Sequence, residues 1–266
     1  MKFNKLRKYR RIFYLLGIIA FLTIFVILQR NYKNTLCSNI KVTVLDSAEN
    51  RYVTESSIIN FIYNNIQSDI VGNKFRYIDL GLIEEKLNDD FFIKSVEVFR
   101  SQNGIIEIKI TQRKPIARIY NELGENYYID EDGYFLPTSK NFASYVPVFN
   151  GKIKKIDSLF TRKINVLDTS FKDQTHKDLY NLAKILKNDE FTLSMIDQVF
   201  VDENNEFIMI PKVGNFKIIF GTLENAEIKI RNLKAFYTEG APKVGWNKYS
   251  AINLNYINQV VCTKRN

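Results

Sequence analysis

Histidine and cysteine are scarce in this chain of 266 residues, which contains one histidine, His176, and two cysteines, Cys37 and Cys262. A histidine-based triad or zinc site would have to use His176, which has no serine elbow and no second metal ligand beside it in the sequence. We therefore predict a surface histidine on the polar side of a helix. Two cysteines cannot form a disulfide framework, so the fold must depend on a hydrophobic core; a single bridge between them is left open.

Other signatures of catalysis are missing as well. The sequence has neither a G-x-G-x-x-G motif nor a phosphate loop ending in G-K-[ST]. Paired carboxylates such as Glu84 and Glu85 are adjacent on a predicted helix and point about 100° apart, which is a poor geometry for acid/base chemistry. We therefore expect a protein that is not an enzyme, with no catalytic residue, cofactor, metal site or small-molecule substrate.

Acidic residues are absent from the first 36 positions, which hold eight of the 38 basic residues. The rest of the chain is almost balanced, at 30 basic against 29 acidic residues. The formal net charge of +9 therefore reflects the N-terminal segment. A nucleic-acid-binding face is not needed to explain it, and we expect no nucleic-acid partner.

The longest uncharged apolar run extends from Ile12 to Leu28 and follows six basic residues within the first 11 positions. At roughly 1.5 Å per residue it forms a helix of about 26 Å, close to the thickness of a bilayer core. The positive-inside rule then predicts a cytoplasmic tail (1–11), one transmembrane helix (12–28), a linker (29–37) and export of the remainder. The alternatives are a buried core helix or a signal peptide, but no small-x-small cleavage site follows the run.

The fold class predicted for the exported part is α+β, beginning with a β-α-α-β-β domain over residues 38–115. Alternating aliphatic residues predict a strand over 39–45 with one buried face. Thr54 and Asp79 each stand at an N-cap position before apolar residues at helical spacing, so two helices are expected to cover one face of the sheet.

A hairpin is expected to complete this first domain. Strand-like runs over 91–100 and 105–113 are joined by Ser-Gln-Asn-Gly, whose Asn-Gly pair is expected to supply the positive φ angles of a tight turn. Pro115 cannot donate to a strand ladder, so it is expected to mark a strand end or an edge.

A mostly antiparallel β domain with flanking helices is predicted for residues 116–262, followed by a short tail, 263–266. The run Asp130-Glu131-Asp132-Gly133 lacks the later ligands of a calcium loop and favours a solvated hairpin turn. Apolar spacing predicts helices over 175–186 and 223–237, the second with its lysines and arginine facing water. The strands are expected at 147–149, 196–202, 206–211, 216–220 and 249–262.

Several motifs in the first domain carry a family resemblance. They are Ile78-Asp79-Leu80, Leu87, Phe91-Phe92-Ile93-Lys94-Ser95-Val96-Glu97-Val98, Gly104 and Ile108-Lys109-Ile110-Thr111-Gln112-Arg113-Lys114-Pro115-Ile116-Ala117. In this order, within residues 38–117, they resemble the POTRA domain of the FtsQ/DivIB bacterial cell-division family. POTRA domains also occur in outer-membrane assembly and secretion proteins, so this resemblance indicates fold better than role.

The C-terminal run from Tyr249 to Cys262 resembles the terminal strand pair of the same family. The resemblance implies that the last strand is an unpaired edge, to which FtsB, which travels with FtsL, adds a strand. The partner-binding residues that it implies are Tyr249, Ile252, Leu254, Tyr256, Asn258, Gln259 and Val260. Tyr256 matches the recognition tyrosine, whereas the family's acidic and basic positions are occupied by Asn253 and Asn255, so the charge-assisted contact at the basic position cannot form.

The resemblance implies a non-enzymatic, single-pass scaffold of the divisome in the inner membrane at the division septum, with its C-terminal domains in the periplasm. It would bind FtsB, FtsL and other divisome proteins and link them to septal peptidoglycan synthesis. The alternative is a POTRA-bearing factor for envelope transport or outer-membrane assembly. That role normally accompanies repeated POTRA units or a membrane β-barrel, and the sequence contains one such unit.

Overall fold

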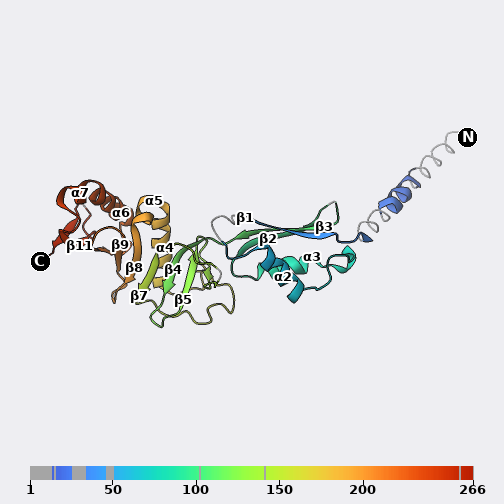
Figure 1. Ribbon diagram of the computed structural model, residues 1–266, viewed down its shortest axis with the longest axis horizontal. Helices are drawn as coiled ribbons and strands as arrows, with labels where there is room; N and C mark the ends of the chain where they lie inside the picture. Colours follow the sequence, from blue (N-terminus) through green and yellow to red (C-terminus); the bar gives the residue numbers. More distant parts are fainter. Residues whose placement is uncertain are drawn as a thin grey trace, which may run out of the picture. The chain divides into compact units, whose positions relative to one another are not determined.

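The computed structural model describes residues 14, 16–25, 34–45, 51–101, 103–140, 142–257 and 259–265 (Figure 1). Contacts divide the chain into two units. Unit 1 comprises residues 1–47 and 53–112, and unit 2 comprises residues 48–52 and 113–266. The boundary near residue 113 lies close to the domain boundary expected after residue 115.

The predicted transmembrane segment, 12–28, is described only in part, and the basic tail, 1–11, lies outside the described residues. Residues 16–25 are helical. Within the described ranges, no helix combines the length and apolar character that a membrane span requires.

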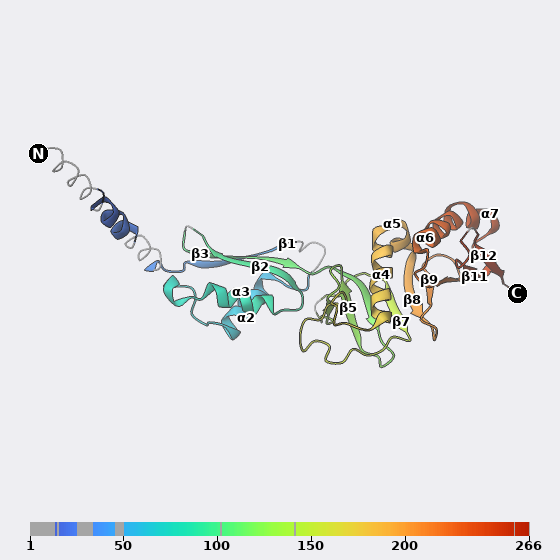
Figure 2. The ribbon, with the colours of Figure 1, turned by 180° about the vertical axis from the view of Figure 1, so that it is seen from behind.

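Unit 1 is a three-stranded sheet with helices on one face (Figures 1 and 2). In sheet order β1-β3-β2, β3 runs parallel to β1 and antiparallel to β2. Its elements are β1 (Asn39–Leu45), α2 (Glu55–Asn65), η1 (Phe75–Tyr77), α3 (Leu80–Asn88), β2 (Ile93–Arg100) and β3 (Ile105–Gln112). The predicted order of strand, helix, helix, strand and strand is confirmed.

Local chemistry explains where these helices begin. The Thr54 hydroxyl accepts the Ser57 amide at 3.2 Å, and the Asp79 carboxylate accepts the Leu82 amide at 3.0 Å, so both predicted N-caps are present.

The predicted hairpin between β2 and β3 is also present. The Ser101 amide donates to the Ile105 carbonyl oxygen at 2.8 Å across the turn, and Gly104 has φ +72°. The expected positive φ is therefore found at Gly104, where a residue without a side chain suits the left-handed backbone, but not at Asn103, so the Asn-Gly pair supplies one positive φ angle instead of two.

Unit 2 contains a nine-stranded sheet in the order β12-β11-β10-β9-β8-β7-β4-β5-β6. Among these described strands, five pairings are antiparallel, while β4–β7, β7–β8 and β10–β11 are parallel. The strands are β4 (Pro115–Tyr120), β5 (Asn126–Asp130), β6 (Phe135–Leu136), β7 (Val148–Gly151), β8 (Ile196–Val201), β9 (Phe207–Pro211), β10 (Lys217–Gly221), β11 (Tyr249–Asn253) and β12 (Val261–Lys264). The mostly antiparallel sheet is confirmed; Pro115 begins β4.

Helices α4, α5 and α6 lie on one face of this sheet (Figures 1 and 2). The helical elements are α4 (Gln174–Asn188), α5 (Glu190–Met195), α6 (Ala226–Ala235), the π-helical turn η2 (Phe236–Gly240) and α7 (Ala241–Val244). Leu179, Leu182 and Leu186 of α4 are fully buried, as their helical spacing predicts.

Three polar residues of unit 2 are buried where the sequence predicts exposure. His176 is 0% exposed and lies 2.7 Å from both the Tyr127 hydroxyl and the Asp173 carboxylate, so the prediction of a surface histidine is wrong. Lys229 is 6% exposed and donates to the Thr222 carbonyl oxygen at 2.8 Å, which corrects its expected place on the solvated face of the helix. Each group tolerates burial because it has a polar partner.

The third is Asp130 in the Asp-Gly turn. The predicted hairpin between β5 and β6 is present, with Gly133 at φ +90°, but Asp130 is 0% exposed and not solvated. One carboxylate oxygen lies 2.8 Å from the Arg113 guanidinium, and the other accepts the Asp132 and Tyr134 amides. The carboxylate therefore organises the turn from inside the domain.

Candidate partner-binding edge at strand β12

The two edges of the nine-stranded sheet differ in how they are covered. At β6, the Phe135 amide donates to the Ile164 carbonyl at 3.1 Å and the Val166 amide donates to the Gly133 carbonyl at 2.8 Å, so a segment of the same chain covers this edge. At the opposite edge, β12 pairs with β11, and within the described residues no strand lies on its other side. The open backbone edge of the sheet is therefore β12.

The backbone of β11 alternates between its two neighbours. The Leu254 amide, just after β11, donates to Ile219 of β10 at 2.9 Å. Successive peptide groups of a strand point to opposite sides, so Ala251 and Asn253 face β12, where they pair with Thr263 and Val261.

The backbone of β12 alternates in the same way. The Arg265 amide donates to the Lys248 carbonyl at 3.0 Å, on the β11 side, and Val261 and Thr263 share its direction. Cys262 consequently directs its N–H and C=O groups toward the open edge, and the Lys264 N–H shares their direction, whereas the Lys264 carbonyl accepts the Ser250 hydroxyl of β11 at 3.4 Å.

The side chains of β12 make its two faces different. Cys262 is half-buried against the hydrophobic core of unit 2, and burial raises the pKa of its thiol. Val261, on the other face, is 39% exposed, and Thr263 and Lys264 are exposed. A charged residue on a short edge strand is a common protection against uncontrolled pairing, and Lys264 occupies such a position.

The predicted partner-binding residues fall into two groups. Tyr249 and Ile252 lie on β11, and Ile252 and Leu254 are 0% exposed, so these residues support the edge from inside the sheet. Tyr256 is 49% exposed on the loop between β11 and β12, where Gln259 is exposed and Val260 is half-buried. Asn258 lies outside the described residues.

The sequence reasoning missed the residues that present the backbone of the edge, Cys262 and Lys264. The run expected as strand over 249–262 forms two antiparallel strands joined by a loop, and the second strand continues to Lys264. The β-forming run Val-Val-Cys-Thr could have identified them, because it predicts a separate last strand whose backbone groups point alternately to its two sides. Both cysteines are free, so the bridge left open by the sequence is not formed.

The loop that carries Tyr256 is fixed at both ends. Leu254 is buried in the core, and the Asn232 carboxamide on α6 donates to the Ile257 carbonyl at 3.0 Å. Gly221 has φ +70°, and a Cβ there would overlap the Asn255 side chain, so this glycine allows the loop to pack closely against the end of β10. The position of Tyr256 therefore depends on packing from α6 and β10.

The buried Tyr127, His176 and Asp173 form a hydrogen-bonded series that links β5 to the start of α4. The Asp173 carboxylate also accepts the His176 amide at 2.9 Å as the N-cap of α4. Burial raises the pKa of Tyr127, and the hydrogen bond from His176 lowers the pKa of Asp173. Because Tyr127 and His176 are both 0% exposed, the arrangement acts as a structural cross-link. No cluster of metal-ligating residues occurs in the described part of the chain.

The described residues form an α+β protein whose larger sheet ends in an open backbone edge beside an exposed tyrosine, which is the kind of edge to which a further strand can be added. Comparison with known families supports a more specific assignment. A model for a POTRA-like domain matches residues 35–111, and a model described as "FtsQ/DivIB, C-terminal related" matches residues 114–263, more than half of the chain. The chain therefore belongs to the FtsQ/DivIB family, which indicates a role in cell division through interactions with other division proteins. A search of curated proteins finds no match.

Proposed function

We propose that this protein is a non-enzymatic, membrane-tethered scaffold of the bacterial divisome that binds FtsB, together with FtsL, by strand addition to β12. The observation that carries the proposal is the asymmetry of the nine-stranded sheet: its own chain covers β6, whereas among the described residues β12 has an uncovered outer side. A partner strand would bond to the outward backbone groups of Cys262 and Lys264, and the exposed ring of Tyr256 would contact its side chains.

The membrane tether in this proposal is the segment 12–28. Its support is the uncharged sequence and the six basic residues that precede it, which favour a cytoplasmic N-terminus and periplasmic units 1 and 2. Protease treatment of intact spheroplasts tests this topology: an N-terminal tag should be protected, while units 1 and 2 should be digested. Protection of both ends would contradict the orientation.

A capture experiment tests the binding mode. The full-length protein, solubilised in detergent, is used to pull down the FtsB and FtsL ectodomains of the same organism. Tyr256→Ala removes the exposed ring, and Val260→Pro removes an amide just before β12; each should abolish capture without unfolding unit 2.

The matched control for this experiment is Tyr145→Ala. Tyr145 is also an exposed tyrosine of unit 2, at 87% exposure, but it lies just before β7, in the middle of the sheet rather than at the β12 edge. The control should retain capture, because no backbone group of the open edge changes. Undiminished capture by both Tyr256→Ala and Val260→Pro would refute strand addition.

The alternative role, a POTRA-bearing transport or assembly factor, shares only unit 1 with this proposal. The C-terminal family match favours the division role, because it covers the unit that carries the open edge. Imaging of a fluorescent fusion in dividing cells separates the two: a midcell band is expected for the scaffold, and a uniform envelope signal for the transport factor.

A further inference from the structure

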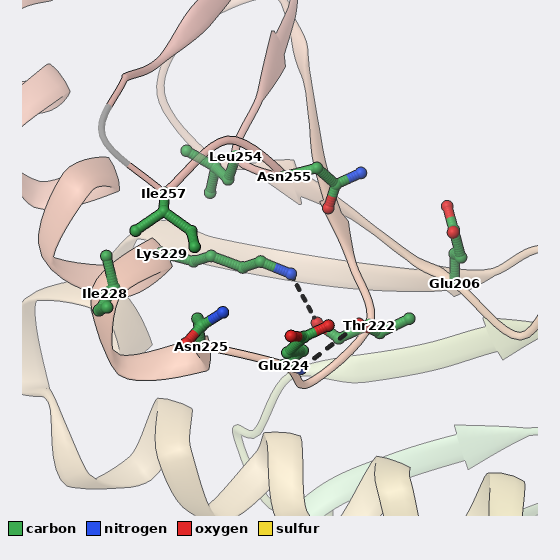
Figure 3. A pocket seen from close by; sticks show the side chains of 9 residues that line it. All are labelled: Glu206, Thr222, Glu224, Asn225, Ile228, Lys229, Leu254, Asn255 and Ile257. Atoms are coloured by element: carbon green, nitrogen blue, oxygen red, sulfur yellow. Dashed lines mark hydrogen bonds between the residues drawn. The ribbon is translucent and has the colours of Figure 1, made fainter.

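A pocket of about 250 Å³ lies where the loop after β11 passes over the start of α6 (Figure 3). The loop contributes Leu254, Asn255 and Ile257, of which Asn255 and Ile257 flank the exposed Tyr256. The remaining lining residues come from the ends of the neighbouring strands and from α6: Glu206, Thr222, Glu224, Asn225, Ile228 and Lys229. The pocket therefore adjoins the segment that leads into β12.

The lysine of the pocket is already engaged within the protein. Its amine donates to the Thr222 carbonyl at 2.8 Å (Figure 3). The same amine lies 5.1 Å from the centre of the Phe220 ring. Only 6% of Lys229 is exposed, so this cation is held at the inner side of the pocket. Burial lowers its pKa, and the nearby Glu224 and Glu206 oppose that shift.

The acidic residues of the pocket remain available. Glu224 is exposed and Glu206 is half-buried, and among the described residues neither forms an ion pair. Two carboxylates against one ammonium give the lining a net negative charge. The Asn255 side chain is turned onto Gly221 and adds no charge. The two carboxylates are hydrogen-bond acceptors, so a cation that donates hydrogen bonds complements this lining.

We propose that this pocket receives a basic side chain, arginine or lysine, from the partner segment that pairs with β12. The aliphatic stem would lie against Leu254 and Ile257, and the charged head would lie between the carboxylates of Glu206 and Glu224. Arginine suits the site better than lysine, because its planar guanidinium offers several donors in a fixed fork that matches a carboxylate. This inference rests on the proposed strand addition to β12 and specifies the chemistry of the partner.

Binding of the FtsB and FtsL ectodomains to the full-length protein in nanodiscs tests the proposal. The double variant Glu206→Gln, Glu224→Gln should weaken binding about fivefold at low salt and reduce its salt dependence. The matched control is Glu203→Gln, which removes a carboxylate from the same β8–β9 connection as Glu206. Glu203 pairs with Lys152 at 3.1 Å and does not line the pocket, so this control should leave binding unchanged. Thermal unfolding of each variant verifies that unit 2 remains folded.

Replacing each arginine and lysine of the partner segment by glutamine identifies the inserted side chain. One of these replacements in the partner should weaken binding by the same factor as the double variant. Combining that partner replacement with the double variant should then cause no further loss of binding. Unchanged or tighter binding by the double variant overturns the pocket assignment. If Cys262→Pro still weakens binding in that case, strand addition stands without the pocket; if Cys262→Pro binds normally, the proposed function itself fails.

Discussion

The orientation of the β12 backbone leads to a sharp prediction about two neighbouring residues. Replacing Cys262 by proline removes an amide that faces the open edge, and replacing Thr263 by proline removes an amide that faces Ala251 of β11. The first change should act on partner binding, and the second on the fold. The two variants differ by one position in the sequence, so each serves as the control for the other.

The magnitudes follow from the hydrogen bonds at stake. A backbone hydrogen bond contributes about 1 kcal/mol net, and a proline ring at position 262 would disturb at least two bonds of an added strand. The expected loss of about 2 kcal/mol corresponds to roughly 30-fold weaker binding of FtsB and FtsL. The same variant should lower the free energy of unfolding by less than about 1 kcal/mol, because the bonds to β11 are kept. Thr263→Pro should lower it by about 1 to 2 kcal/mol, because it loses a bond to β11.

Biolayer interferometry with the full-length protein in nanodiscs measures the affinity, and thermal unfolding followed by circular dichroism measures the stability. The reasoning is refuted if Cys262→Pro binds with wild-type affinity at unchanged stability. It is also refuted if the two variants lose the same stability, because the amides of Cys262 and Thr263 would then not face opposite sides of β12.

Three further predictions concern the interior of unit 2. Asp130→Ala leaves the buried Arg113 guanidinium without its carboxylate and should lower the free energy of unfolding by about 3 to 5 kcal/mol; denaturant titration showing less than about 1 kcal/mol would contradict a buried pair. Tyr127→Phe removes the hydroxyl that meets His176 at 2.7 Å, and urea titration should show a loss of about 1 to 3 kcal/mol. The pKa of Asp173 is lower in the folded than in the unfolded protein. Its carboxylate therefore contributes its full stabilisation above the unfolded-state pKa, near 4, and loses it as the pH falls through the lower folded-state pKa. Asp173→Asn should therefore flatten the acid side of the stability profile, and an unchanged profile would argue against this linkage.

Local pattern was sufficient to predict many elements of the fold. The alternation through Ile40 and Val42 predicts β1, and the caps at Thr54 and Asp79 predict the starts of two helices. These features depend on residues within a few positions of one another, which is why sequence reasoning finds them. The apolar residues of the C-terminal run 249–262 likewise predicted β structure there.

The tertiary structure decided which polar residues are buried. His176 is buried because it meets Tyr127, 49 residues earlier, and Asp130 is buried because it meets Arg113 on a neighbouring part of the sheet. A helical or turn pattern reports only which positions share a side of an element, whereas the burial of a polar group depends on a partner that the fold brings to it.

The candidate site shows the same division. The sequence alone predicted β-forming residues over 249–262, with Tyr256 among them, whereas the exposure of Tyr256 was found in the structure. The strand order decided that β11 is enclosed between β10 and β12 and that β12 is the open edge of the described sheet. Pairing with β11 also decided which backbone groups of β12 face outward. Strand order and register arise from contacts between distant segments, so they become visible only when the chain is folded.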